Sequence, residues 1–131
     1  IVQINQIGYK LKNDGHQIGQ IISSSAQRTQ ETTAIANHYL GIRKVDFFRD
    51  LYLARHDFIL HHIIQHANED SVLYVGHNFG ISDLATHLAE EVYSMSTGML
   101  IHFQFELDSW DQLSQGTGIV KEAYPPNILI P

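Results

Sequence analysis

The chain has 131 residues, no cysteine and a formal net charge of −6. This length supports one domain with a core of its own, and the lack of cysteine excludes disulfides, thiolate chemistry and cysteine-zinc sites. The negative charge argues against a general nucleic-acid or acidic-membrane binder, and no segment is long and apolar enough to span a bilayer, so we expect a soluble, cytoplasmic protein.

Apolar residues recur at helical spacing in some segments, and form short continuous or alternating runs typical of strands in others. Strands that alternate with helices and then end in a hairpin-like segment predict an α/β sandwich with a mostly parallel sheet and no internal repeat. In the first half of the chain the patterns predict a helix at 2–12, a strand at 20–22, a helix at 26–40 and a strand at 45–48. In the second half they predict a helix at 57–67, a strand at 72–75, a helix from Ile81, and strands at 99–107 and 118–123.

Residues 23–28, Ser-Ser-Ser-Ala-Gln-Arg, join a predicted strand to a predicted helix. A serine just before a helix is a common cap, and Gly41 is well placed to end this helix. Arg28 then falls in the first turn, where the helix dipole disfavours a cation unless an anion binds there too. A surface arginine paired with Glu31, or simply solvated, is the alternative explanation.

A second turn of the same kind follows the apolar run Val72–Val75 and contains Gly76, His77 and Asn78. The run predicts a buried strand, the glycine ends it, and Asn78 or Ser82 can cap the next helix. His77 is then expected at the edge where α/β sheets usually bind ligands. Taken alone, a histidine after a strand is often structural or merely exposed.

The two turns are expected to lie close together, because turns that follow parallel strands share one edge of the sheet. Arg28 and His77 would then face one ligand. An arginine fork and an imidazole near helix N-termini suit a phosphate group.

These turns resemble motifs of the histidine phosphatase (phosphoglycerate mutase-like) superfamily, and within it of the SixA-type phosphohistidine phosphatases. IISSSAQRTQET resembles the family's Ser-Ser-Pro-x-x-Arg-x-x-x-Thr turn with Ser25 in place of proline, and VLYVGHN resembles its second-histidine motif. STGMLIHFQFELDSW, followed by residues 116–120, looks like the C-terminal strands of the SixA group. The resemblance spans nearly all of residues 1–131. It implies a single domain, a three-layer α/β/α sandwich with an antiparallel edge at the C-terminus.

One family motif has no counterpart in this sequence. Family members begin with a strand that ends in Arg-His-Gly or Arg-His-Ala, and that histidine becomes phosphorylated. We therefore expect the full-length protein to carry roughly 25 to 30 residues before Ile1, including an Arg-His pair, because a sheet without a central strand has unpaired edges. The other histidines stand in contexts that do not match this motif, namely His16, His38, His56, His61, His62, His66, His87 and His102.

For the complete protein the resemblance implies a two-step reaction, in which the missing histidine attacks phosphorus and water then hydrolyses the phosphohistidine intermediate. Arg28 would clamp the equatorial oxygens, His77 would donate a hydrogen bond to them, and the backbone N–H of Asn78 would assist. The implied substrate is phosphohistidine in a protein, such as a phosphotransfer domain, and phosphate is released. The implied enzyme needs no metal or cofactor. We also expect a monomer, and the negative charge predicts that it binds neither nucleic acid nor membrane.

A phosphate-ester phosphatase of the same superfamily is one alternative. Such members usually carry an additional acid, and the short link after Gly41 offers only Asp46, Asp50 and Asp57. Since a phosphorylated imidazole leaves more easily than an alkoxide, the short link favours a phosphohistidine substrate.

Two further alternatives belong to other classes. A phosphohistidine-binding module without catalytic activity would fit a chain that lacks the nucleophile. A metal site at His61, His62 and His66 is the other, although a solvated, histidine-rich helix face explains the same spacing.

Overall fold

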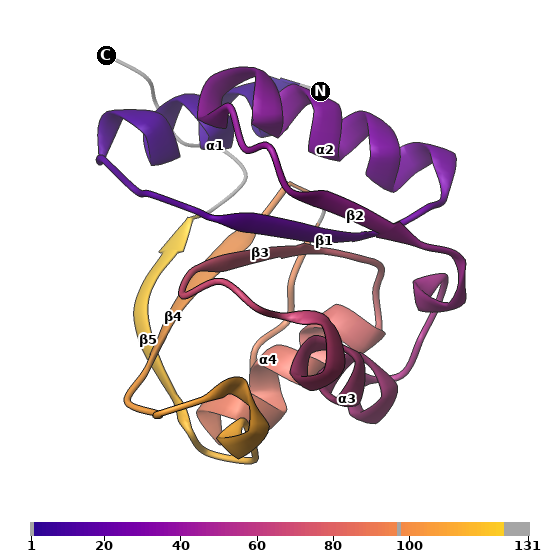
Figure 1. The fold of residues 1–131 in the computed structure, drawn as a ribbon, viewed down its shortest axis with the longest axis vertical. Helices are drawn as coiled ribbons and strands as arrows, with labels where there is room; N and C mark the ends of the chain where they lie inside the picture. Colours follow the sequence, from indigo (N-terminus) through magenta and orange to yellow (C-terminus); the bar gives the residue numbers. More distant parts are fainter. Residues whose placement is uncertain (1, 97, 125–131) are drawn as a thin grey trace.

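The computed structural model describes residues 2–96 and 98–124, which form three layers (Figure 1). A parallel sheet of strand order β2-β1-β3 lies in the middle, with α1 and α2 on one face and α3 and α4 on the other. The helices are α1 (Val2–Asn13), α2 (Gln27–Leu40), α3 (His56–His66) and α4 (Gly80–Ala89), with short 3₁₀ helices η1 (Arg49–Leu51) and η2 (Trp110–Gln112). The strands are β1 (Gln20–Ser24), β2 (Val45–Phe48), β3 (Val72–Val75), β4 (Leu100–Phe105) and β5 (Gly118–Tyr124).

The predicted α/β architecture is confirmed, and each predicted helix and strand is present with small shifts at its ends. Gly41 ends α2 in the left-handed conformation, with φ of 64°, and its N–H donates to the Asn37 carbonyl at 2.9 Å, as the sequence predicted. Thr97, which belongs to a segment used for the family resemblance, lies outside the described residues.

β1 is the central strand, and helices cover both of its faces. Ile21 and Ile22 are therefore fully buried, as is the polar Gln20. The Gln20 side chain keeps its hydrogen bonds, because it donates to Asp46 Oδ2 at 3.1 Å and to the His66 carbonyl at 3.0 Å. It also accepts from the Asn68 N–H at 3.1 Å, so the side chain ties β1 to β2 and to the end of α3.

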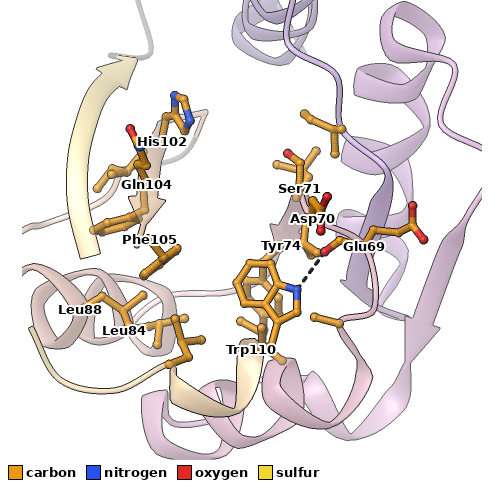
Figure 2. Close-up of a pocket in the computed structure, with 18 of the residues that line it drawn as sticks. Glu69, Asp70, Ser71, Tyr74, Leu84, Leu88, His102, Gln104, Phe105 and Trp110 are labelled. Carbon is orange, nitrogen blue, oxygen red and sulfur yellow. Dashed lines mark hydrogen bonds between the residues drawn. The ribbon is translucent and has the colours of Figure 1, made fainter. Parts of the chain in front are cut away.

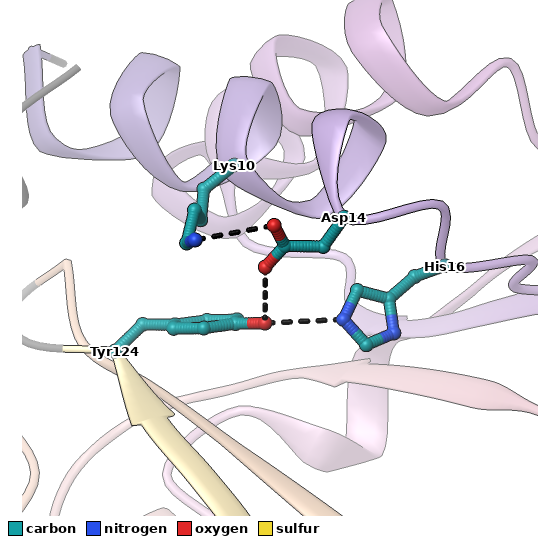
Figure 3. Close-up of polar contacts among 4 residues, drawn as sticks. All are labelled: Lys10, Asp14, His16 and Tyr124. Carbon is teal, nitrogen blue, oxygen red and sulfur yellow. Dashed lines mark hydrogen bonds and ion pairs between the residues drawn. The ribbon is translucent and has the colours of Figure 1, made fainter. Parts of the chain in front are cut away.

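β4 and β5 pair antiparallel and form a two-stranded sheet of their own, separate from the parallel sheet in the described part of the chain. A hydrogen-bonded cluster joins the end of β5 to the end of α1 (Figure 3). The buried Tyr124 hydroxyl donates to Asp14 Oδ2 at 3.3 Å and lies 3.1 Å from His16 Nε2, while Lys10 pairs with Asp14 Oδ1 at 3.1 Å. Burial raises the pKa of Tyr124 to about 12, so the hydroxyl keeps its proton.

The main core lies between the sheet and the helices α3 and α4, and Ile59 and Ile63 face it as predicted. His62 lies on the same side of α3 and is only 4% exposed. The prediction of a solvated histidine-rich face is therefore wrong for His62, whereas His61 is exposed. The spacing of three residues from Ile59 places His62 on the buried stripe. No helix in the described ranges is long and apolar enough to cross a bilayer.

Candidate functional site

The strands β1, β2 and β3 run parallel, so the turns that follow them lie at one edge of the sheet, which we call the carboxyl edge. Ser24 pairs with Phe48, and Ser23 pairs with Val75, at the last paired positions of these strands. The turns at 25–28, 49–52 and 76–78 therefore begin side by side. This arrangement agrees with the sequence prediction that the first and third turns are neighbours.

The serine turn after β1 is held by hydrogen bonds to buried side chains. Ser24 Oγ accepts from the Ala26 N–H at 3.2 Å, and Thr29 Oγ1 donates to the Ser24 carbonyl at 2.8 Å. The Ser25 N–H donates to the Phe48 carbonyl at 3.1 Å, which joins this turn to the end of β2. The predicted serine cap is wrong: Ala26 is the N-cap residue, and no side chain caps α2.

Arg28 lies in the first turn of α2, and its side chain is exposed. Within residues 2–96 and 98–124 its guanidinium takes part in no hydrogen bond or ion pair. The expected alternative partner, Glu31, instead accepts a hydrogen bond from Gln27 Nε2 at 3.1 Å. A guanidinium without a partner thus stands near the unpaired N–H groups of a helix start, where an anion is favoured.

His77 follows β3 after Gly76, and the glycine allows this tight turn. A Cβ at Gly76 would lie 2.5 Å from the Tyr74 ring. The His77 Nε2 atom is buried and has no hydrogen-bond partner in the described residues. Burial lowers the pKa of His77, so the imidazole is neutral at pH 7 and carries one N–H to donate.

Asn78 holds the turn through its side chain. Its Oδ1 accepts from Ser82 Oγ at 2.6 Å, its Nδ2 donates to the Met95 carbonyl, and Ser82 Oγ accepts from the Met95 N–H at 2.9 Å. The predicted caps are wrong, because Phe79 is the N-cap of α4 and no side chain caps it. The backbone N–H of Asn78 has no partner in the part of the chain that is described, and so is free to donate.

Tyr52 is a residue of the carboxyl edge that the sequence did not predict. It follows η1, and its ring lies edge-on to the His77 ring with centroids 5.2 Å apart. The side chain is 60% exposed, so it borders His77 at the surface. The only available signal was its position four residues after the end of a parallel strand.

The histidines of α3 do not form a metal site with other ligands. Among the described residues, no group of three or more histidine, aspartate or glutamate side chains is placed to hold a metal ion. The His62 and His66 rings contact each other in a tilted arrangement with centroids 4.2 Å apart, and His62 also contacts the Phe48 ring. This packing accounts for His62 as part of the core.

No protein-family model and no curated protein matches the sequence, whereas solved structures match the fold. A protein assigned as the phosphohistidine phosphatase SixA from Nakamurella multipartitia superposes with a TM-score of 0.83 at 21% identity, over 95% of this chain and 80% of that one. The corresponding assigned SixA from Agrobacterium tumefaciens gives 0.78 at 20% identity, over 96% and 79%. A protein histidine phosphatase SixA complexed with tungstate gives 0.78 at 16% identity, over 94% and 78%.

The chain has a SixA-type fold. The resemblance predicted from the two turns and the C-terminal segment is therefore confirmed for the fold.

In this SixA-type fold a cavity of about 710 Å³ separates β3 from β4 (Figure 2). Consecutive residues of both strands line it, 72–74 from β3 and 100–105 from β4. Because successive side chains of a strand point to opposite faces, this lining means that strand edges border the cavity. Leu11 of α1 and Leu84 and Leu88 of α4 add apolar lining.

Among the described residues that line the cavity, Tyr74 has the one hydroxyl that is buried and has no hydrogen-bond partner. Its burial raises the pKa, so the group is a neutral donor and acceptor. The lower end of the cavity is closed by Trp110, whose Nε1 donates to the Glu69 carbonyl at 2.8 Å (Figure 2). The cavity is thus a slot between two open strand edges, lined by both apolar and polar side chains.

Proposed function

We propose that the full-length protein is a phosphatase that removes phosphate from phosphohistidine in proteins, through a phosphohistidine intermediate on the enzyme. The main support is that Arg28 and His77 follow adjacent parallel strands at the carboxyl edge, and that neither the guanidinium nor His77 Nε2 has a partner in the described residues. A tetrahedral oxyanion supplies acceptors for both groups. The SixA that was solved with tungstate carries such an anion.

In the first step of the proposed reaction, an enzyme histidine attacks phosphorus and the P–N bond of the substrate breaks. The leaving imidazole takes up a proton. Water then attacks the phosphohistidine, phosphate leaves, and the enzyme histidine is free again. Arg28 would balance charge on the equatorial oxygens, and His77 and the Asn78 N–H would donate hydrogen bonds to them, so the reaction requires no metal.

The slot between β3 and β4 suits the strand that would carry the enzyme histidine. A strand placed there would pair with both open edges, and its two faces would be covered by α1 and α4. If it runs parallel to β3, it ends at the carboxyl edge, beside His77. We propose that residues before Ile1 in the full-length protein form this strand, and that they complete a single domain.

Each of the three candidate acids for ester hydrolysis lies close to another polar side chain. Asp46 lies within β2 and accepts from Gln20, and Asp57 lies 3.7 Å from Arg55 at the start of α3. Asp50 Oδ1 lies 3.7 Å from the buried His62 Nε2. A phosphohistidine substrate, which depends less on an added acid, remains the better proposal.

The test is hydrolysis of a histidine-phosphorylated protein and of p-nitrophenyl phosphate by the full-length protein. We expect Arg28→Ala and His77→Ala each to lower kcat/KM at least about 100-fold, as for other groups that stabilise transition-state charge. EDTA is expected to leave the rate unchanged. Arg43→Ala and His61→Ala are matched controls, because both side chains are exposed and lie outside the carboxyl edge.

Two outcomes would contradict parts of the proposal. A rate that falls with EDTA would indicate a required metal. An open reading frame that starts at Ile1, together with binding of the phosphoprotein without turnover, would show that the protein is a phosphohistidine-binding module.

A further inference from the structure

Exposed apolar side chains gather around His77. Eight large apolar side chains are exposed among the described residues, and four of them belong to segments that flank the carboxyl edge. These four, which we call the apolar collar, are Tyr52 at 60%, Leu53 at 60%, Phe58 at 43% and Phe79 at 83% exposure. Scattered single apolar residues need no explanation, but a contiguous group marks an interaction surface.

The segments that carry the collar pack on one another. The Tyr52 ring contacts the His77 ring, and Phe79 follows two residues later in the same turn. The loop after Tyr52 lies directly against the first turn of α4, since a Cβ at Gly80 would come within 2.0 Å of the Ala54 carbonyl oxygen. Leu53 and Phe58 line one shallow hollow.

The charges beside the collar are mixed in sign. Asp50, Arg55 and Asp57 share the hollow with Leu53 and Phe58, and Arg55 pairs with Asp57 at 3.7 Å. A highly charged partner would gain little from such a surface, whereas an apolar protein surface would bury the collar. Leu53 is also held at a positive φ of 52°, a backbone conformation that disfavours a non-glycine residue, and its side chain is 60% exposed.

We infer that the apolar collar is the docking surface for the folded protein domain that carries the phosphohistidine. This inference rests on the proposed function. When the phosphohistidine of a protein substrate reaches His77, the rest of that substrate protein must lie against Tyr52, Leu53 and Phe79. Free phosphohistidine or a small phosphate ester is too small to cover the collar. The collar therefore distinguishes a protein substrate from a small one.

The test compares two substrates with the full-length protein and its Leu53→Ser and Phe79→Ser variants. One substrate is a phosphotransfer domain phosphorylated on histidine with phosphoramidate, and the other is free phosphohistidine. Each variant is expected to lower kcat/KM for the phosphorylated domain at least about tenfold, mainly through KM, and to change that for free phosphohistidine less than twofold. Val92→Ser is the matched control, because Val92 is 86% exposed and lies outside the collar.

Equal losses on both substrates, or no loss on the phosphorylated domain, would overturn the inference. If the wild-type protein hydrolyses neither substrate, the proposed function is wrong, and binding then tests the collar separately. Calorimetric titration with the phosphorylated domain should show at least about tenfold weaker binding by the two collar variants and unchanged binding by Val92→Ser. Equal affinities for all of these proteins would show that the collar is not the docking surface.

Discussion

His62 lies within the core with both ring nitrogens buried and without a hydrogen-bond partner in the described residues. The rings of Phe48 and His66 pack against it, at centroid distances of 4.3 and 4.2 Å. Burial lowers the pKa of His62, the charge of a protonated His66 lowers it further, and Asp50 acts in the opposite direction. The neutral ring therefore fills space in the core while its polar atoms lose their hydration.

Replacing His62 with leucine should stabilise the protein. An unsatisfied buried polar atom costs about 1–3 kcal/mol, and leucine fills a similar volume without one. We expect His62→Leu to raise the free energy of unfolding at pH 8 by about 1 kcal/mol in urea titrations. His61→Leu, at the adjacent exposed position, should stay within about 0.5 kcal/mol of wild type. A large decrease in the free energy of unfolding of His62→Leu would show that the contact with Asp50 stabilises the protein by more than the lost hydration of His62 destabilises it.

At the scale of elements, the start of α4 sets the position of the loop that carries Tyr52. Gly80 is buried, and the Ala54 carbonyl occupies the space that a side chain would need. Glycine is a weak helix former, so its presence in the first turn is explained by this close approach. The approach brings the turn after β3 and the loop after β2 together at the carboxyl edge.

Gly80→Ala should therefore affect both stability and activity. The added methyl group must push the 52–54 loop away, which we expect to cost about 1–3 kcal/mol of stability and to lower phosphatase kcat/KM about tenfold. Gly41→Ala is the matched control: it strains a backbone with φ of 64° at about 1–2 kcal/mol, but nothing lies within 4 Å of its added Cβ. Urea unfolding and steady-state kinetics measure both effects. Equal activity in the two variants would show that the loop position does not matter.

At the scale of the whole molecule, three partly or fully buried histidines make the fold sensitive to acid. Burial is the largest cause of a lowered pKa in His62, His77 and His102, relative to the usual value of 6.5. Near and below pH 6.5 the unfolded chain binds protons that the folded chain does not bind. Stability is therefore complete above this pH and falls as the pH drops toward the lowered pKa values of the folded protein.

We expect the free energy of unfolding to decrease between pH 7.5 and pH 5.5, with a slope of at most about 1.4 kcal/mol per pH unit for each histidine. His62→Leu should reduce this slope, and His61→Leu should leave it unchanged. Urea titrations at a series of pH values measure it. A flat profile over this range would contradict the assignment of neutral, buried imidazoles.

Local patterns determined much of the fold and of the candidate site. The short apolar run before Gly76, and the serines before Arg28, mark strand-to-helix turns through residues only a few positions apart. Strand and helix order then implied that both turns share one edge, and strand pairing between Ser23 and Val75 agrees with this. The site residues Arg28, His77 and Asn78 remain a proposal about function.

The sequence by itself determined the order of helices and strands, the glycine end of α2 and the two turns of the carboxyl edge. Only the tertiary structure decided that β4 and β5 pair with each other, that Tyr52 borders His77, and that His62 is a core residue. The physical reason is the distance along the chain over which each kind of interaction acts. Turn chemistry and periodicity act between residues close in the chain, whereas strand pairing and burial depend on contacts between distant segments, which no local pattern encodes.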